Sequence, residues 1–168
     1  MSVVIEPATL RVRRAVPGDE PILRAVRLRA LTESPHAYGS TLARELERTP
    51  ADWASWIYPD PCWFLCTAAG EVVGLAAGFH DREEDGVVVL AAVWVDPGVR
   101  GRGGVGLLVD AFLVWAHEQM PGAIRLWVID TNHVARRAYE RHGFALTGLA
   151  VARDRDGVVE LEMRRPIA

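Results

Sequence analysis

The sequence predicts a single domain of the α/β (α+β) class, with mainly antiparallel strands arranged about one central strand–helix–strand crossover. Three observations lead to this prediction. Segments with strand-like and helix-like spacing of apolar residues follow one another along the chain. A nearly continuous apolar stretch, residues 87–95, is followed by a glycine-rich turn and a helix. The 168 residues, half of them apolar, suffice for one hydrophobic core, and no linker or repeat divides residues 1–168.

The first half of the chain is expected to form a strand, two helices and a hairpin. Residues 11–16 fit a strand that ends at Pro17, and the apolar residues between 22 and 31 recur with helical spacing. A loop follows at 34–40. A second amphipathic helix is predicted for residues 41–57, where Pro50 can restart a helix at its first turn. Residues 63–67 and 72–80 are predicted strands joined by a tight turn.

The second half begins with the central strand. Residues 87–95 are almost entirely apolar, as expected for a strand buried on both faces. A helix at 107–118, a strand at 124–129 and a helix at 132–142 follow, the last ended by Gly143 with Phe144 beyond it, which fits a glycine cap with its apolar contact. Residues 144–152 and 158–163 are expected to close the chain as a hairpin about Gly157.

Charge and composition narrow the classes of function. The formal charge of -3 and the pI near 5.9 argue against a broad surface for nucleic acid or anionic membrane, so no partner of either kind is expected. No apolar run approaches the roughly eighteen residues of a membrane span, and the N-terminus lacks a signal-peptide pattern, so we expect a soluble cytoplasmic protein. Cys62 and Cys66 are expected to be reduced thiols, and no His/Cys cluster predicts a metal site.

The glycine-rich turn, residues 100–106, is the strongest candidate for a binding site. It reads Arg-Gly-Arg-Gly-Gly-Val-Gly and lies between the predicted central strand and a helix. Backbone N–H groups and the helix dipole can converge there on an anion, and glycine permits close approach of the backbone. The side chains of Arg100 and Arg102 can add charge-assisted contacts. The turn therefore predicts a phosphate site.

A dinucleotide-binding domain is an alternative interpretation of the same turn. Gly101, Gly103 and Gly106 match the spacing of that fingerprint, and Asp130 follows the next strand at roughly the expected distance. Against it, five residues separate the strand from the first glycine, and only one helix and a hairpin follow the unit. A doubly wound sheet needs more parallel units than remain.

Two motifs together resemble the GNAT superfamily of N-acetyltransferases. Arg100 and Gly103 fit the family's Arg/Gln-x-x-Gly-x-Gly/Ala loop, although Val105 stands in its last slot. The second motif begins at Leu126 and continues through Asn132, Ala135, Tyr139 and Gly143-Phe144. Asn132 and Tyr139 are seven residues apart, so they share one face of a helix. The resemblance covers about 55 residues, 93–144.

By this resemblance the fold is the GNAT fold, a central mixed, mostly antiparallel, twisted sheet of about six or seven strands flanked by about four helices. It implies acetyl-CoA as co-substrate, without a metal, between the central strand and the strand near Ile124. In the family the amine attacks the thioester directly, a strand N–H polarises the acetyl carbonyl, and Tyr139 would be the catalytic acid. The implied cofactor-binding residues are Val93, Val95, Arg100, Gly101, Arg102, Gly103, Gly104, Val105, Gly106, Asn132 and Tyr139.

The general base and the acceptor are less well defined. Many family members carry a Glu on the central strand, where this chain has Ala91 and Ala92; Glu45, His80 and Asp130 are spare candidates. Residues 33–45 and 72–85 are expected to shape the acceptor site, with Tyr38, Trp53, Trp56 and Trp94 as a candidate aromatic wall. We expect an N-acetyltransferase acting on an amine of a small molecule or of a peptide, and the resemblance admits a homodimer. A non-catalytic acyl-CoA-binding module is the alternative from another class.

Overall fold

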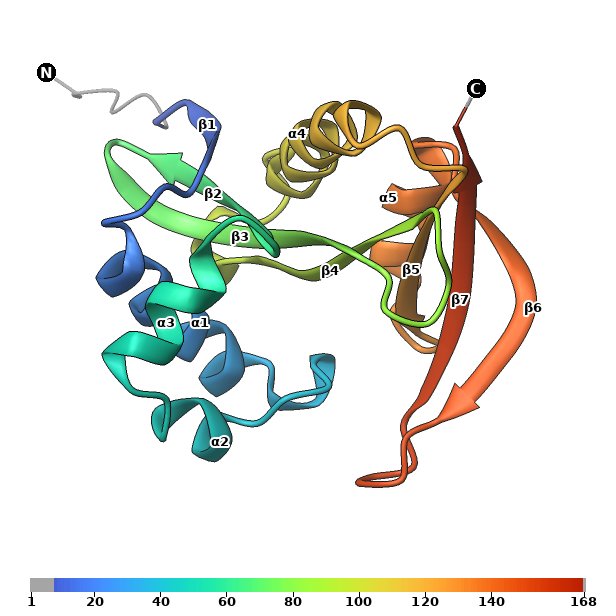
Figure 1. Ribbon diagram of the computed structural model, residues 1–168, viewed down its shortest axis with the longest axis horizontal. Helices are drawn as coiled ribbons and strands as arrows, with labels where there is room; N and C mark the ends of the chain where they lie inside the picture. The colour runs from blue at the N-terminus through green and yellow to red at the C-terminus, as the bar shows by residue number, and fades with distance from the viewer. Residues whose placement is uncertain (1–7, 168) are drawn as a thin grey trace, which may run out of the picture.

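The computed structural model describes residues 8–167. The single-domain prediction and the search for a signal peptide also included residues 1–7 and 168, which lie outside the described part. The strands are β1 (Leu10–Arg14), β2 (Cys62–Ala68), β3 (Glu71–His80), β4 (Val87–Val95), β5 (Ala123–Ile129), β6 (Ala145–Ala152) and β7 (Val159–Pro166). The helices are α1 (Glu20–Glu33), α2 (Leu42–Leu46), α3 (Pro50–Ile57), α4 (Gly104–Glu118) and α5 (His133–Arg141), with short 3-10 turns η1 (Pro35–Ala37) and η2 (Pro97–Val99) (Figure 1).

The seven strands form one mixed sheet in the order β1-β2-β3-β4-β5-β7-β6. Within the described residues β4 and β5 are the one parallel pair, and every other neighbouring pair is antiparallel. The predicted fold class is therefore confirmed. Because a doubly wound dinucleotide fold needs a mostly parallel sheet, the topology rules out that alternative.

The number of helices differs from the sequence prediction, since the helix expected at residues 41–57 is divided into α2 and α3. Thr49 is the reason. Its hydroxyl accepts a hydrogen bond from the backbone N–H of Asp52, and the Asp52 carboxylate accepts one from the backbone N–H of Thr49. This capping box, with Pro50 at the first helical position, starts a new helix there. The sheet is thus flanked by five helices rather than about four.

Two apolar clusters pack on the two faces of the sheet. On one face, Phe112 and Trp115 of α4 pack with Phe64 and Val88 of the strands. On the other face, Leu23 and Leu31 of α1 and Trp53 of α3 pack against Leu65, Leu75 and Trp94. Figure 1 shows α4 on one side of strands β1–β4 and α1, α2 and α3 on the other. A ligand that passes between strands of this sheet therefore meets different elements on each side.

The parallel pair separates halfway along its length. Pairing between β4 and β5 runs from Val87 with Ala123 to Leu90 with Leu126, and it stops there. The rest of β4 stays hydrogen-bonded to β3, and the rest of β5 to β7. A bulge accompanies the separation, because Ala92 and Val93 stand opposite a single residue of β3 and Ala92 has a positive φ of 57°. The sheet therefore opens between the carboxyl ends of β4 and β5.

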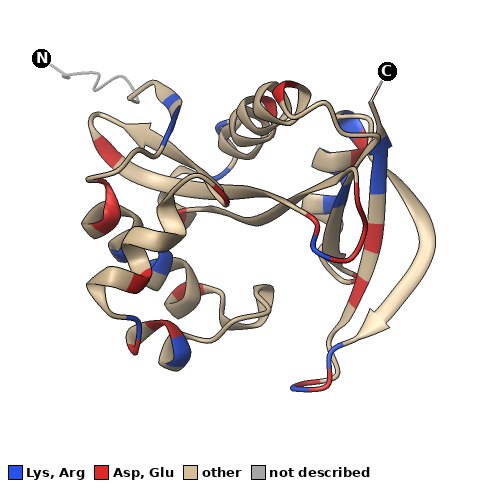
Figure 2. Cartoon of the chain, viewed as in Figure 1, with Lys and Arg blue, Asp and Glu red and all other residues tan. Residues whose placement is uncertain are grey.

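Surface charges of both signs are interspersed over the molecule. Figure 2 shows basic and acidic residues side by side along β7 and at the tip of the β6–β7 hairpin, whereas β6 carries neither. Among residues 8–167 no helix is long and apolar enough to cross a membrane. Cys62 and Cys66 on β2 are free thiols, and burial raises the pKa of both.

Candidate active site

A cleft of about 760 Å³ lies where β4 and β5 separate. Its walls are the unpaired edges of the two strands, the glycine-rich turn that leads into α4, the face of α5 and the start of the segment after α1. The lining residues are Ser34, Ala37, Tyr38, 90–95, Arg100, Gly101, 103–106, 127–129, Asn132, Val134, Ala135, Ala138, Tyr139, Arg141 and His142. Every predicted cofactor-binding residue, with the exception of Arg102, therefore borders one cavity.

The glycine-rich turn presents backbone N–H groups to this cleft. Gly101 and Gly103 have positive φ angles of 79° and 83°, a region that side chains disfavour. Gly103 caps α4, which begins at Gly104 instead of at the predicted residue 107, and the first intrahelical bond of this end runs from the Leu107 N–H to the Gly103 carbonyl. The three preceding N–H groups, of residues 104–106, therefore have no acceptor within the helix, and together with the helix dipole they suit an anion.

Gly104 is required for a further reason, which is its distance to the central strand. A Cβ atom at this position would lie 3.2 Å from Cγ2 of Val95, closer than an ordinary contact. Val105, the departure from the family pattern, occupies the second helical position, where its N–H still faces the open end of the helix, and its half-buried side chain packs against the apolar core. The turn thus keeps its N–H groups despite the substitution.

The side chains of the two arginines of the turn, which were expected to contact phosphate, bind other parts of the protein instead. The Arg100 side chain borders the cleft, but its guanidinium donates to the Val95 carbonyl at 2.9 Å and to Oε2 of Glu33 at 2.8 Å. Arg102 does not line the cleft, and its guanidinium donates to the carbonyl of Ala8. Both side chains hold the turn to other parts of the protein, so the candidate anion site consists of backbone groups.

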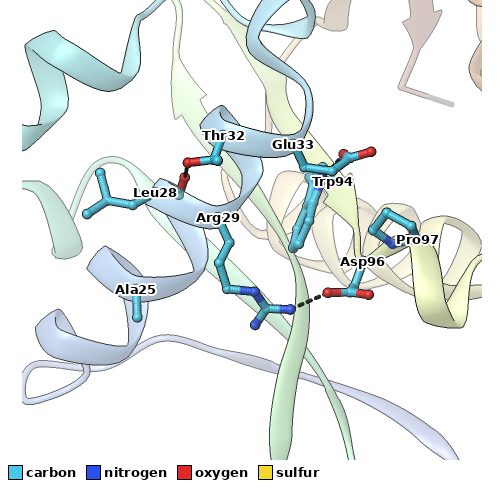
Figure 3. Close-up of a pocket in the computed structure, with 8 residues that line it drawn as sticks. All are labelled: Ala25, Leu28, Arg29, Thr32, Glu33, Trp94, Asp96 and Pro97. Atoms are coloured by element: carbon cyan, nitrogen blue, oxygen red, sulfur yellow. Dashed lines mark hydrogen bonds and ion pairs between the residues drawn. The ribbon is translucent and has the colours of Figure 1, made fainter.

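Glu33, at the end of α1, is the partner of Arg100 and a residue with a perturbed pKa. Its Oε2 accepts hydrogen bonds from the Ser34 hydroxyl, from the Trp94 indole N–H at 2.9 Å and from Arg100. These donors, Ser34 first, lower the pKa of Glu33 to about 2. Figure 3 shows Glu33 beside Trp94, where Arg29 points at Asp96; these residues line a second, smaller cavity of about 390 Å³. Glu33 is therefore a fixed anion rather than a proton acceptor.

Asn132 and Tyr139, from α5, form the opposite wall. Asn132 caps the helix, since its Oδ1 accepts a hydrogen bond from the Ala135 N–H at 3.2 Å, and its amide NH₂ has no partner among residues 8–167. Tyr139 lies in the last turn of α5, at the opposite end of the helix from Asn132. The Phe144 N–H donates to the Tyr139 carbonyl, the Gly143 N–H donates to that of Glu140, and the rings of Tyr139 and Phe144 lie 6.2 Å apart. This Schellman motif fixes the backbone at the end of α5, and Tyr139 borders the cleft.

The Tyr139 hydroxyl suits a proton donor. The residue is 7% exposed, and burial raises the pKa of its phenol above the usual value, so the group is neutral over the physiological range. Within the described part of the chain the hydroxyl has no hydrogen-bond partner. Its proton is thus free to be donated to a ligand atom in the cleft.

Tyr38 supplies a second phenol to the cleft, which the sequence had indicated only as an aromatic candidate. The residue is 5% exposed, its buried hydroxyl has no partner within the described residues, and burial raises its pKa. The Arg27 guanidinium lies 4.8 Å from the centre of its ring. Of the other candidate aromatic residues Trp94 also borders the cleft, whereas Trp53 is buried in the core.

The candidate bases lie away from the cleft. Glu45 is fully buried in an ion pair with Arg27, His80 lies beside Asp60 at the end of β3, and Asp130 is not among the lining residues. No carboxylate borders the cleft among residues 8–167. His142 does border it, with Nε2 3.2 Å from Asp110. Sequence reasoning missed His142 because it occupies one of the unspecified positions between Tyr139 and Gly143 in the family motif.

A mixed sheet that opens at its parallel strand pair, with a glycine-rich helix start at the opening, defines the architecture of the GNAT acetyltransferases. An acetyltransferase of this family from Streptococcus pneumoniae superposes with a TM-score of 0.80 at 18% identity, covering 95% of this chain and all of that one. A GCN5-related N-acetyltransferase from Kribbella flavida gives 0.70 at 26% identity, covering 94% and 98%. The yncA protein of Salmonella typhimurium, solved with its cofactor acetyl-CoA, gives 0.74 at 17% identity, covering 96% and 95%.

Sequence comparison identifies the family directly. The model of the Acetyltransferase (GNAT) family matches residues 27–144, and the chain belongs to this family. A mycothiol acetyltransferase from Rhodococcus erythropolis is 32% identical over 151 residues, and one from Rhodococcus jostii is 33% identical over 149. Each match covers 84% of this chain, which spans about half the length of these relatives, 48% and 47%.

Proposed function

We propose that the protein is an acetyl-CoA-dependent N-acetyltransferase that acts on a primary amine of a small molecule. The observation that carries the proposal is the opening between β4 and β5, which brings the N–H groups at the start of α4 and the side chain of Tyr139 to one cleft. Coenzyme A has the matching order of groups, with phosphates at one end and a thioester at the other. Family membership and the acetyl-CoA complex of the yncA protein support the same ligand.

The residues present fit this ligand. The N–H groups of residues 104–106 would hold the pyrophosphate, as they lack acceptors within the helix. The edge of β4 from Ala91 to Val95 has lost its β5 partner, so its backbone groups are free to pair with the amides of the pantetheine arm. Asn132 borders the same cleft, where its NH₂ group would donate to the ligand.

Tyr139 would act as the general acid. Acetyl-CoA supplies a thioester whose thiolate has a conjugate acid of pKa about 8.5, so it leaves readily, and proton donation by Tyr139 is expected to add about 10-fold to a few hundred-fold. The acceptor nitrogen bonds to the acetyl carbon, the carbon–sulfur bond breaks, and the Tyr139 proton passes to sulfur. An N–H of β4 near the bulge would polarise the acetyl carbonyl.

We expect water or buffer, rather than a side chain of the cleft, to take the proton that the acceptor amine must lose. An alkylammonium has a pKa of about 10.4 and must lose a proton before attack. Since no carboxylate lines the cleft in residues 8–167, we expect acetyl transfer to depend on the fraction of amine that is neutral. The proton that leaves the amine can return through water to the Tyr139 phenolate, which closes the proton balance.

The relatives favour a small acceptor. Two relatives are mycothiol acetyltransferases, which are named for a small molecule. A peptide or protein amine remains the second candidate within this reaction class.

A non-catalytic acyl-CoA-binding module is supported by one observation, the missing carboxylate on β4, where Ala91 and Ala92 stand. The two functions are separated by incubating the protein with acetyl-CoA and a panel of primary amines, and by following thiol release and acetylated amine together. Equal amounts of free thiol and acetylated amine would establish the transferase. Binding of acetyl-CoA without release of thiol, across the whole panel of amines, would instead support the non-catalytic binding module.

A further inference from the structure

Two arginines tie the β6–β7 hairpin to the segment after α1. The Arg153 guanidinium donates to the carbonyls of Tyr38 at 2.7 Å and of His36 at 2.6 Å. Arg155 donates to the carbonyls of Tyr38 at 2.9 Å, Ser40 at 3.1 Å and Gly39 at 3.3 Å. Five hydrogen bonds thus join two segments that lie more than a hundred residues apart in the sequence.

The hairpin itself holds Arg153 in place for this contact. Its side chain is only 10% exposed, and it pairs with Asp156 at 3.0 Å and with Glu160 at 3.6 Å. The Gly157 N–H donates to the Arg153 carbonyl, which closes the turn. Because the guanidinium is already oriented by its own hairpin, little side-chain entropy is lost when it binds the carbonyls of residues 36 and 38. The tie is therefore built into the fold rather than a chance surface contact.

The tie spans the opening between β4 and β5. The segment 34–40 follows α1, which packs on β3, whereas the hairpin extends from β7, the neighbour of β5. Both segments lie on the face away from α4: Tyr38 packs in the cluster with α1 and α3, and the glycine-rich turn leads into α4 on the other face. In Figure 1 the segment after α1 and the hairpin tip extend on the side of the sheet opposite α4.

This arrangement implies that the cofactor and the acceptor enter the cleft from opposite faces of the sheet. Phosphates would bind at the turn on the α4 face, so an acceptor that reaches the thioester comes from the other face, past Tyr38. On that face Ser34, Ala37 and Tyr38 line the cleft, and Arg153 and Arg155 hold the backbone of residues 36–40 against the hairpin. A Tyr38 held in this way limits the width of whatever passes it.

On the basis of the proposed function, we propose that Arg153 and Arg155 determine acceptor specificity: their tie between the hairpin and residues 36–40 narrows the acceptor entrance so that a small amine enters and a peptide amine does not. They act as positioning residues, since they touch the segment that carries Tyr38 and not the reacting atoms. Without them the two segments can separate and the entrance widens.

The test uses coenzyme A derivatives that already carry an acceptor, so that neither turnover nor the natural acceptor is needed. Through an acetyl linker on sulfur, one derivative carries n-propylamine and the other carries the amino terminus of a hexapeptide. Dissociation constants of both derivatives and of coenzyme A are measured by calorimetry. The proteins are the wild type, Arg155→Ala, Arg153→Ala/Arg155→Ala and the control Arg11→Ala/Arg24→Ala, which removes two exposed arginines elsewhere.

We expect the wild type and the control to bind the propyl derivative at least about 10-fold more tightly than the hexapeptide derivative, a difference of about 1.4 kcal/mol. In the double variant this ratio should fall to about twofold or less, with the dissociation constant of coenzyme A unchanged. Arg155→Ala, which removes three of the five hydrogen bonds from the more exposed arginine, should lie between them and covers the case that the double variant does not fold.

Equal binding of both derivatives by the wild type would overturn the inference. An unchanged preference in folded variants that lack the tie would overturn it as well. Both results leave the proposed function intact, because coenzyme A still binds. A wild type that binds no coenzyme A at all would overturn the proposed function and this inference with it.

Discussion

The Arg100 guanidinium reaches from the glycine-rich turn to Glu33 at the end of α1, 2.8 Å from its carboxylate. A fixed anion thus lies next to the proposed phosphate site and competes for its nearest cation. We predict that Glu33→Gln tightens acetyl-CoA binding by about two- to fivefold, an effect of about 0.5–1 kcal/mol for a partly exposed pair. Calorimetry at two salt concentrations measures it, and the gain should shrink at high salt. Weaker binding by the variant would show that Glu33 orients Arg100 for the phosphate.

The same carboxylate predicts a dependence of stability on pH. The pKa of Glu33 is lowered from 4.5 to about 2 by hydrogen bonds from Ser34, Trp94 and Arg100, so the folded state favours its ionised form. The stabilisation is present above pH 4.5 and is lost as the pH falls through 2. Denaturant unfolding of the wild type and of Glu33→Gln should therefore show a difference that shrinks between pH 4.5 and 2. A difference that stays constant over this interval would contradict the assignment.

Asn132 combines a helix cap with a group that faces the ligand, and two substitutions separate these roles. Asp caps helices as well as Asn does, so Asn132→Asp should keep the melting temperature while it weakens acetyl-CoA binding, because it removes the amide donor and adds a negative charge. Asn132→Ala loses the cap as well and should cost about 1 kcal/mol of stability. Melting curves with and without acetyl-CoA measure both. Unchanged affinity in the Asp variant would leave Asn132 a purely structural cap.

Gly103 holds the turn in a conformation that an L-residue disfavours, with φ of 83°. Gly103→Ala should lower the free energy of unfolding by about 1–2 kcal/mol and weaken cofactor binding, because the N–H groups of α4 would be displaced. Gly39→Ala is the matched control, since a Cβ there meets no atom within 4 Å and its φ is not positive. Urea titrations compare the two. Similar stability losses in both would show that the positive φ is not what the turn requires.

Tyr139→Phe removes the proposed acid and leaves the ring in its packing. Since burial raises the pKa of Tyr139, its proton is present throughout the physiological range, and kcat/KM should rise with pH as the amine deprotonates, without a decline below pH 10. The variant should lower kcat about 10-fold to a few hundred-fold with little change in acetyl-CoA affinity. Steady-state kinetics from pH 6 to 10 tests both. If the variant keeps the kcat of the wild type, Tyr139 is not the general acid.

Much of the fold could be predicted because local patterns were strong. The predicted bounds of β4 agree with the structure, since its residues are uniformly apolar and Asp96-Pro97 ends it. Gly143 with Phe144 predicted the end of α5 through a local hydrogen-bond motif. The start of α4 was placed three residues late, because glycines have low helix propensity and only the left-handed cap at Gly103 fixes where the helix begins.

Contacts between distant parts of the chain could not be predicted from local patterns. Arg100 and Arg102 were expected at phosphates, yet their partners Glu33 and Ala8 lie 67 and 94 residues away. The carbonyl of Tyr38, which borders the cleft, accepts a hydrogen bond from Arg153, more than a hundred residues later. Such contacts depend on the tertiary arrangement of the strands and helices. The spacing of residues along a single sequence carries little information about that arrangement.

The central claim is that acetyl-CoA binds in the opening between β4 and β5, and thermal denaturation with acetyl-CoA, and separately with NADPH, tests it most directly. A ligand at about 100 times its dissociation constant adds about 2.7 kcal/mol to the folded state, which corresponds to a rise of roughly 5–10 °C for a domain of this size. We predict that rise with acetyl-CoA, a smaller one for Asn132→Asp at the same concentration, and none with NADPH. An unchanged melting temperature with acetyl-CoA, or a rise with NADPH alone, would contradict the account.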